Sequence, residues 1–234
     1  MIEDNLRRLK QQISDIAAGS GRRPEDVVLV CVTKEASLGQ IKQVIALGIS
    51  DIGENRVQDA VGKYNALRGV RDEGRGTLRW HFIGHLQTNK VKNVIEIFDL
   101  IHSVDSFHLA ETISKEAARI NKIQDILIQI NASGEQSKFG IDPHETIALL
   151  RKIISLNSIR VLGFMTIAPL TGDSENIRYC FRKLKELSEE LKVFLPSAKD
   201  EGRKMILSMG MSNDYQIAIE EGATMVRIGS AIFK

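Results

Sequence analysis

The stretch Val27-Val28-Leu29-Val30-Cys31-Val32-Thr33-Lys34 decides the fold. Its valine-rich composition is typical of a strand buried on both faces, because branched side chains pack well on a pleated sheet. The apolar run ends at Lys34, and a helix-like pattern begins directly after it. A lysine amine at the end of a buried strand can attack a carbonyl group and form a Schiff base. The simpler alternative is a strand-end lysine whose amine reaches water.

Outward from this strand, apolar strand patterns and amphipathic helix patterns alternate eight times. The further strands are expected at 51–54, 80–84, 100–104, 126–130, 161–165, 205–209 and 225–229. The helices are expected at 38–47, 56–67, 88–98, 107–121, 143–156, 174–194 and 212–221, with one extra helix at 2–18 and loops at 68–77 and 196–203. Such alternation favours parallel strands, and eight repeats favour a closed barrel over an open sheet. The sequence therefore predicts an α/β protein, a single (β/α)8 TIM barrel domain over residues 1–234 with an N-terminal helix.

Composition limits the classes of partner. Lys and Arg number 32 and Asp and Glu number 30, a net charge of +2, which argues against nucleic acid or a membrane as the main partner. Cys31 and Cys180 lie in apolar or amphipathic contexts and are interpreted as buried thiols. No apolar run approaches the roughly 20 residues that span a bilayer. We therefore expect a cytoplasmic protein.

The last two strands end in glycine-rich loops. Gly210-Met211-Ser212 leads into a helix that Ser212 would cap, and Gly229-Ser230 leads into a final helical turn. Glycine lets backbone N–H groups approach an anion, and barrels often bind phosphate with the loops after strands seven and eight. The alternative is that Ser212 and Gly229 serve only as cap and turn residues.

Barrel closure would place these loops beside Lys34. A cofactor with a phosphate and an aldehyde fits that arrangement, which indicates pyridoxal 5′-phosphate. Arg227 is the nearest candidate for the pyridine nitrogen, and because arginine only donates hydrogen bonds it would leave that nitrogen unprotonated. The alternative for Arg227 is a salt bridge at the barrel rim.

Motifs over nearly the whole chain resemble the YggS/PROSC family of pyridoxal phosphate homeostasis proteins. They are Val32-Thr33-Lys34, Ile52-Gly53-Glu54-Asn55-Arg56-Val57-Gln58, Trp80-His81-Phe82-Ile83-Gly84-His85-Leu86-Gln87-Thr88-Asn89-Lys90, Gln129-Ile130-Asn131, Ser137-Lys138-Phe139-Gly140-Ile141, Gly163-Phe164-Met165-Thr166, Leu207-Ser208-Met209-Gly210-Met211-Ser212-Asn213-Asp214 and Val226-Arg227-Ile228-Gly229. The resemblance implies a barrel like the N-terminal domain of alanine racemase.

By this resemblance, Lys34 carries pyridoxal 5′-phosphate as a covalent internal aldimine. The resemblance also implies the other cofactor-binding positions: Asn55 and Met165 beside the ring, Arg227 on the pyridine side, Ser208 at the end of its strand, and Met211, Ser212, Gly229 and Ser230 at the phosphate. No metal site is expected. His81 and His85 are interpreted as site-lining or structural residues, and His102, His108 and His144 as residues of rims and caps.

The resemblance implies a carrier that holds the cofactor and buffers or delivers it, with PLP-dependent apo-enzymes as partners, and we expect a monomer without established catalysis. The runner-up is a weak PLP-dependent amino-acid racemase, and a third candidate is a phosphate-binding isomerase without the cofactor. A racemase needs an acid–base group on each face of the substrate. Tyr64, Tyr179 and Tyr215 lie in or beside helices, so surface or packing roles are expected for them instead.

Overall fold

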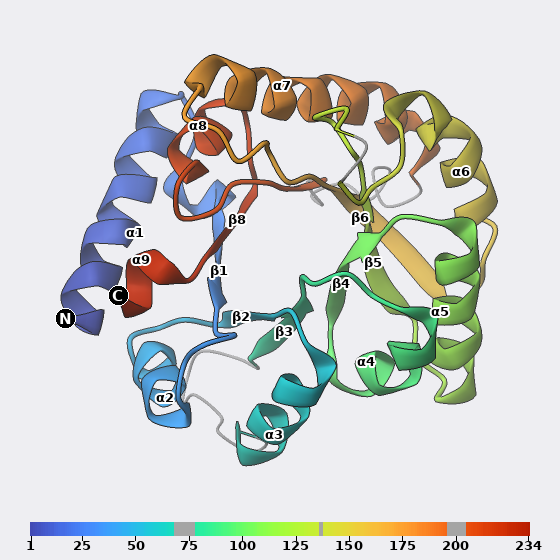
Figure 1. Cartoon of the computed structure of the whole chain (residues 1–234), viewed down its shortest axis with the longest axis horizontal. Helices are drawn as coiled ribbons and strands as arrows, with labels where there is room; N and C mark the ends of the chain where they lie inside the picture. Colours follow the sequence, from blue (N-terminus) through green and yellow to red (C-terminus); the bar gives the residue numbers. More distant parts are fainter. Residues whose placement is uncertain (68–77, 136–137, 196–204) are drawn as a thin grey trace.

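Eight parallel strands form a closed barrel in the computed structural model, which describes residues 1–67, 78–135, 138–195 and 205–234 (Figure 1). The strands are β1 Val28–Val32, β2 Asp51–Glu54, β3 Arg79–Phe82, β4 Leu100–Val104, β5 Gln124–Gln129, β6 Ile159–Met165, β7 Ile206–Ser208 and β8 Met225–Ile228. Each pairs with its neighbours in chain order, and β8 closes on β1 through the pairs from Val28 with Met225 to Cys31 with Ile228. The predicted barrel is confirmed.

Helices surround the barrel. They are α1 Ile2–Gly19, α2 Leu38–Ala46, α3 Val57–Leu67, α4 Val91–Ile97, α5 Phe107–Arg119, α6 Thr146–Ile153, α7 Ser174–Leu191, α8 Tyr215–Glu220 and α9 Ser230–Phe233. Short 3-10 turns are η1 Pro24–Asp26, η2 Thr88–Lys90, η3 Pro143–Glu145 and η4 Lys192–Phe194. Helices expected at 88–98, 143–156 and 174–194 are thus each divided into an α-helix and such a turn. The loops expected at 68–77 and 196–203 lie outside the described residues.

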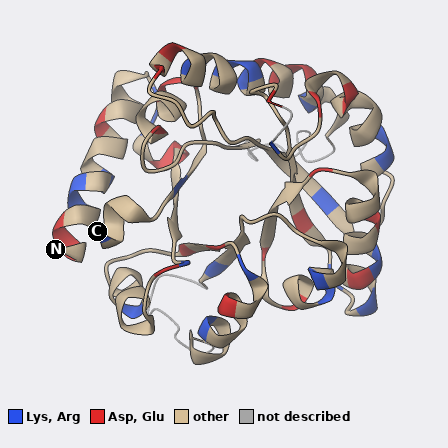
Figure 2. Cartoon of the chain, in the orientation of Figure 1, with Lys and Arg blue, Asp and Glu red and all other residues tan. Residues whose placement is uncertain are grey.

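The predicted N-terminal helix completes the helical ring. In Figure 1, α1 lies between α8 and α2, and the C-terminal α9 lies beside it. Asn5 Nδ2 of α1 donates to the Ile232 carbonyl of α9 at 3.2 Å, so both chain ends are fixed to the same side of the barrel. Acidic and basic residues are interspersed around the helices in Figure 2.

Two layers of apolar side chains make the core. The larger lies between strands and helices, while Val30, Leu100, Leu127, Met165 and Met225 form a second cluster. Side chains alternate along a strand, so this second set shares the inner face with the strand-end residues described below. In the described part of the chain, no helix is long and apolar enough to cross a membrane.

Candidate functional site

Lys34 lies two residues beyond β1, at the carboxyl end of the barrel. Its side chain is half exposed, and its Nζ lies 3.7 Å from Glu35 Oε1. The preceding Thr33 is fully buried, and its backbone N–H donates to the Gly53 carbonyl at 2.9 Å. The backbone before Lys34 is therefore fixed, while its half-exposed side chain can be reached by a molecule at the barrel mouth.

Two glycines shape the loops after β7 and β8. A Cβ at Gly229 would lie 2.8 Å from the Val32 carbonyl oxygen, so this glycine lets the loop after β8 approach β1 closely. Gly210 has a φ of +94°, and a Cβ there would lie 2.6 Å from Ala218 Cβ. Gly229 precedes α9, where Ser230 is the first helical residue and is exposed. The two glycines thus let the loop after β7 pack closely on α8 and the loop after β8 on β1, the strand that precedes Lys34.

The expected cap at Ser212 is wrong. α8 begins at Tyr215 and Asp214 is its N-cap residue, so the helix starts later than residue 212. The Asp214 carboxylate accepts a hydrogen bond from the Met211 N–H. Burial raises the pKa of Asp214, although the Met211 N–H and the charge of Arg227 oppose the shift. Ser212 stays half-buried in the loop, where its hydroxyl is not needed as a cap.

The two expected ring neighbours lie on other strand ends. Met165 ends β6 and is buried in the inner cluster, and Asn55 follows β2 in a half-buried position. A Cβ at Gly84 would lie 2.1 Å from the Asn55 carbonyl oxygen, so the loops after β2 and β3 touch at this glycine. The backbone of Asn55 therefore lies in close contact with the loop after β3.

Arg227 lies inside the barrel, not at its rim. It is 5% exposed, and its guanidinium donates to Ser208 Oγ at 2.6 Å and to the Thr166 carbonyl at 3.0 Å. Burial lowers its pKa to about 10, opposed by Asp214. The alternative of a rim salt bridge is wrong, because the Arg227 hydrogen bonds within the described residues go to uncharged oxygens of buried groups.

His102 is expected at a rim or cap, but this prediction is wrong: the residue is fully buried in β4. Its Nδ1 lies 2.9 Å from Ser208 Oγ, and its Nε2 lies 3.0 Å from Nδ1 of the buried His81. Its pKa lies well below the ordinary value because of burial and the nearby His81 and Arg227. His108 and His144 are exposed near helix starts, as expected.

Sequence reasoning missed a charged pair beneath Lys34. Glu54 is fully buried at the end of β2, and Lys63 Nζ donates to its Oε1 at 2.7 Å and to the Thr33 carbonyl at 2.6 Å. Thr33 Oγ1 also donates to Glu54 Oε1, at 2.6 Å. A glutamate ending a buried strand, nine residues before a lysine on the next helix, is the signal that could have revealed it.

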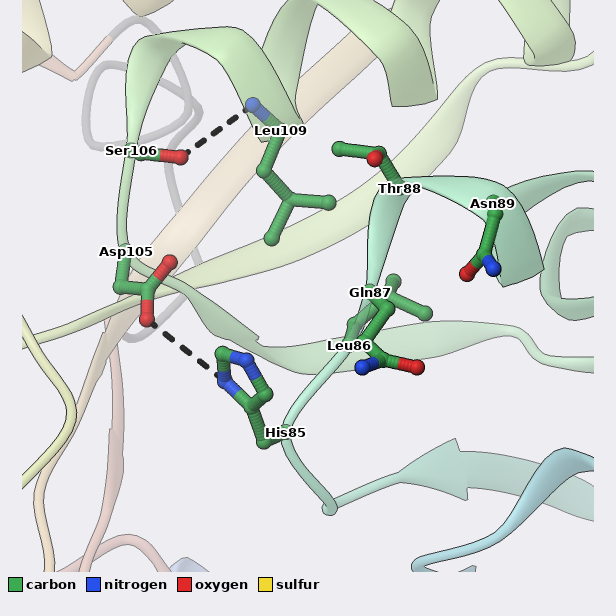
Figure 3. A pocket seen from close by; sticks show the side chains of 8 residues that line it. All are labelled: His85, Leu86, Gln87, Thr88, Asn89, Asp105, Ser106 and Leu109. Atoms are coloured by element: carbon green, nitrogen blue, oxygen red, sulfur yellow. Dashed lines mark hydrogen bonds and ion pairs between the residues drawn. The ribbon is translucent and has the colours of Figure 1, made fainter.

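A pocket of about 520 Å³ opens between the loops after β3 and β4 (Figure 3). Figure 3 shows His85 and Asp105 pointing toward one another, with 3.9 Å between His85 Nδ1 and Asp105 Oδ2. His85 also stacks on Phe139, with 3.9 Å between ring centroids. Burial raises the pKa of Asp105, opposed by His85. This pocket contains none of the predicted cofactor-binding residues, so the interpretation of His85 as a site-lining or structural residue stays a prediction.

Comparisons with known proteins decide the family. Residues 3–234 match the model of the alanine racemase N-terminal domain. A pyridoxal phosphate homeostasis protein of Aquifex aeolicus is 40% identical over 98% of this chain and 96% of its own, and one of Escherichia coli is 37% identical over 99% and 95%. PipY of Synechococcus elongatus, in a structure with PLP bound, is 32% identical over the whole of both chains, with a TM-score of 0.85.

The chain belongs to the YggS/PROSC family of pyridoxal phosphate homeostasis proteins. Alanine racemase of Clostridium difficile shares the fold at a TM-score of 0.69 and 20% identity, and this chain spans 56% of its length. The family relationship therefore extends over the whole chain, whereas the likeness to the racemase concerns the barrel.

Two of the three tyrosines of this family member have partners outside the barrel interior, and the third is exposed. The Tyr215 hydroxyl donates to Gln12 of α1 at 3.0 Å, Tyr64 packs edge-on against Trp80 at 5.4 Å, and Tyr179 is exposed on α7. Both cysteines are buried free thiols, as expected, and burial raises the pKa of Cys31 to about 12.

Proposed function

We propose that this protein binds pyridoxal 5′-phosphate, holds it as a Schiff base at Lys34, and buffers or delivers it to PLP-dependent apo-enzymes. The observation that carries the proposal is the close approach of the loop after β8 to β1, which would place a phosphate cradle formed by the loops after β7 and β8 beside Lys34. At Gly229 a side chain would meet the Val32 carbonyl at 2.8 Å, two residues before Lys34. A phosphate lying there would stand within one cofactor length of the lysine amine.

The residues present fit the cofactor. Gly210 and Gly229 let the loops after β7 and β8 pack closely against α8 and β1. Met211, Ser212 and Ser230 lie in the same two loops, where their N–H and hydroxyl groups could hold a phosphate. Met165, buried in this structure, would contribute an apolar side chain and the half-buried Asn55 a polar one at the strand ends where the ring would lie. When bound, the cofactor supplies an aldehyde that reacts reversibly with amines.

The chain's own residues would bind and orient this molecule. Arg227 only donates hydrogen bonds, so beside the ring nitrogen it would keep that nitrogen unprotonated and weaken the cofactor as an electron sink. The Lys63–Glu54 pair holds the Thr33 carbonyl and hence the start of the Lys34 side chain. The arrangement favours storage over carbon–acid chemistry. Tyr215 bonds to Gln12 and Tyr64 packs on Trp80, and neither contact supports the racemase alternative.

Titration of the ligand-free protein with pyridoxal 5′-phosphate tests the proposal. We expect the absorption band of a protonated Schiff base in the wild type and its loss in Lys34→Ala. The protein is further proposed to be cytoplasmic, to consist of one domain and to be a monomer. Sedimentation of the loaded form would test the monomeric state. Transfer of the cofactor to an apo-enzyme faster than from free solution would support delivery, and an equal rate would contradict it.

A further inference from the structure

Five buried polar side chains are joined by hydrogen bonds into a continuous chain through the barrel interior. They are Asp51 of β2, His81 of β3, His102 of β4, Ser208 of β7 and Arg227 of β8, each no more than 5% exposed. Along the chain, Arg227 Nη1 lies 2.6 Å from Ser208 Oγ, which lies 2.9 Å from His102 Nδ1. His102 Nε2 lies 3.0 Å from His81 Nδ1, and His81 Nε2 lies 2.9 Å from Asp51 Oδ1.

The arginine end fixes where the first proton lies. A guanidinium only donates, so Ser208 Oγ accepts the hydrogen bond from Arg227. Among the described residues, this fully buried hydroxyl has Arg227 and His102 as hydrogen-bond partners, so its own proton goes to His102 Nδ1. Leaving the hydroxyl without an acceptor would cost free energy, because a buried donor loses its hydrogen bonds to water.

The remaining protons follow from this one. With Nδ1 as acceptor, the buried and neutral His102 carries its proton on Nε2 and donates it to His81 Nδ1. His81 must then carry its own proton on Nε2, where the Asp51 carboxylate, which only accepts, lies within hydrogen-bond distance. All four hydrogen bonds therefore point from Arg227 toward Asp51, and both ends of the chain require this direction.

We propose that His102 and His81 are positioning residues for Arg227. Through Ser208 they orient its guanidinium and couple it to the Asp51 carboxylate, which lies at the amino end of β2. Each bond polarises the next, so the Ser208 oxygen becomes a stronger acceptor for the guanidinium. Asp51 itself pairs with Arg79 at 2.8 Å, so the chain is anchored where the barrel begins.

This arrangement has a consequence for the cofactor site. Ser208 and the Thr166 carbonyl accept hydrogen bonds from two of the guanidinium N–H groups, and a guanidinium has further N–H groups that could donate to an acceptor bound in the barrel. The role of these residues toward the cofactor rests on the proposed function, whereas the direction of the hydrogen bonds from Arg227 to Asp51 does not.

Nitrogen-15 NMR of the histidine rings in the ligand-free wild-type protein directly tests the direction of these hydrogen bonds. In both His81 and His102 the ring proton should lie on Nε2, with Nδ1 unprotonated. A proton on Nδ1 of either ring would overturn the proposal. Since neither cofactor nor mutation is involved, this result is independent of whether Lys34 binds pyridoxal 5′-phosphate.

His102→Phe tests the coupling, with Ser103→Ala as the matched control. Ser103 is the adjacent buried residue of β4, and its hydroxyl has no partner among the described residues. His102→Phe removes the hydrogen-bond acceptor of Ser208 and so weakens the Arg227–Ser208 hydrogen bond. The side-chain protons of Arg227 should therefore exchange with solvent severalfold faster, up to about tenfold if that hydrogen bond is lost. Ser103→Ala should exchange like the wild type. An exchange rate in a folded His102→Phe variant equal to that of the wild type, or the same acceleration in the control, would contradict the coupling. If His102→Phe does not fold, the nitrogen-15 spectra of the wild-type histidine rings decide whether the proposal stands.

Discussion

At the residue scale, Gly229 is the point where the proposed phosphate cradle meets β1. A Cβ there would stand 2.8 Å from the Val32 carbonyl oxygen and 3.1 Å from Val32 Cβ, closer than ordinary contacts allow. Because the contacting atoms belong to a strand, the loop after β8 would have to move away. The position therefore links the shape of the cradle to the strand that carries Lys34.

Gly229→Ala is expected to weaken binding of pyridoxal 5′-phosphate and to lower the free energy of unfolding by about 1–3 kcal/mol, the usual cost of overpacking. Calorimetric titration and urea unfolding would measure the two effects. Gly172→Ala is the control, since a Cβ at Gly172 meets nothing within 4 Å. Unchanged affinity in Gly229→Ala would show that the phosphate does not lie in this cradle.

The Lys63–Glu54 pair makes a second prediction at this scale. Glu54 is fully buried and one of its oxygens, Oε2, has no hydrogen-bond partner among the described residues. Removing Lys63 would leave this buried carboxylate uncompensated. Lys63→Met should lower the free energy of unfolding by about 3–5 kcal/mol, as breaking a buried ion pair does.

Urea unfolding at neutral pH measures that loss. Lys42→Met is the control, because Lys42 is exposed on α2 and its loss should leave stability within about 0.5 kcal/mol of the wild type. A Lys63→Met protein as stable as the control would mean that Glu54 does not depend on its partner.

At the scale of elements, α7 holds α8 and thereby the loop after β7. Arg178 and Arg182 of α7 contact Glu221, the residue that ends α8, at 2.8 Å and 3.0 Å. Burial alone raises the pKa of Glu221, but hydrogen bonds and charge from Arg182 and Arg178 lower it below its ordinary value. A lowered carboxyl pKa stabilises the fold above the unfolded pKa, and this stabilisation is lost as the pH falls through the folded pKa.

Glu221→Gln should therefore destabilise the protein at neutral pH by about 1 kcal/mol or less, since Arg182 is half exposed and solvent screens the pair. The difference from the wild type should shrink in high salt and disappear in acid below the lowered pKa. Urea unfolding across pH and salt measures it. A difference that persists in acid would assign the effect to packing instead of charge.

Several elements could be predicted from the sequence because their signals are local. Apolar runs ending in glycine or polar residues located all eight strands within about two residues, the usual uncertainty of element ends. The cap of α8 was not decidable, since Ser212 and Asp214 belong to residue types that cap helices about equally well. Only the structure shows that the Asp214 carboxylate binds the Met211 N–H.

At the scale of the whole molecule, closure of the barrel brings distant residues together. Alternation alone indicated that β8 returns to β1, and hence that Gly229 lies near Lys34. The interior chain from Asp51 to Arg227 could not be predicted in this way. Its five residues come from five strands, and His102 lies within a strand whose residues are all buried.

The central claim, that pyridoxal 5′-phosphate is held covalently at Lys34, can be tested on the intact protein. Loading with the cofactor, reduction with borohydride and peptide mass spectrometry would locate the modified amine, with Lys34→Ala as the control. The account predicts a single reduced adduct on Lys34 and none in the variant. An adduct on another lysine of the wild type, or an equal yield in Lys34→Ala, would contradict it.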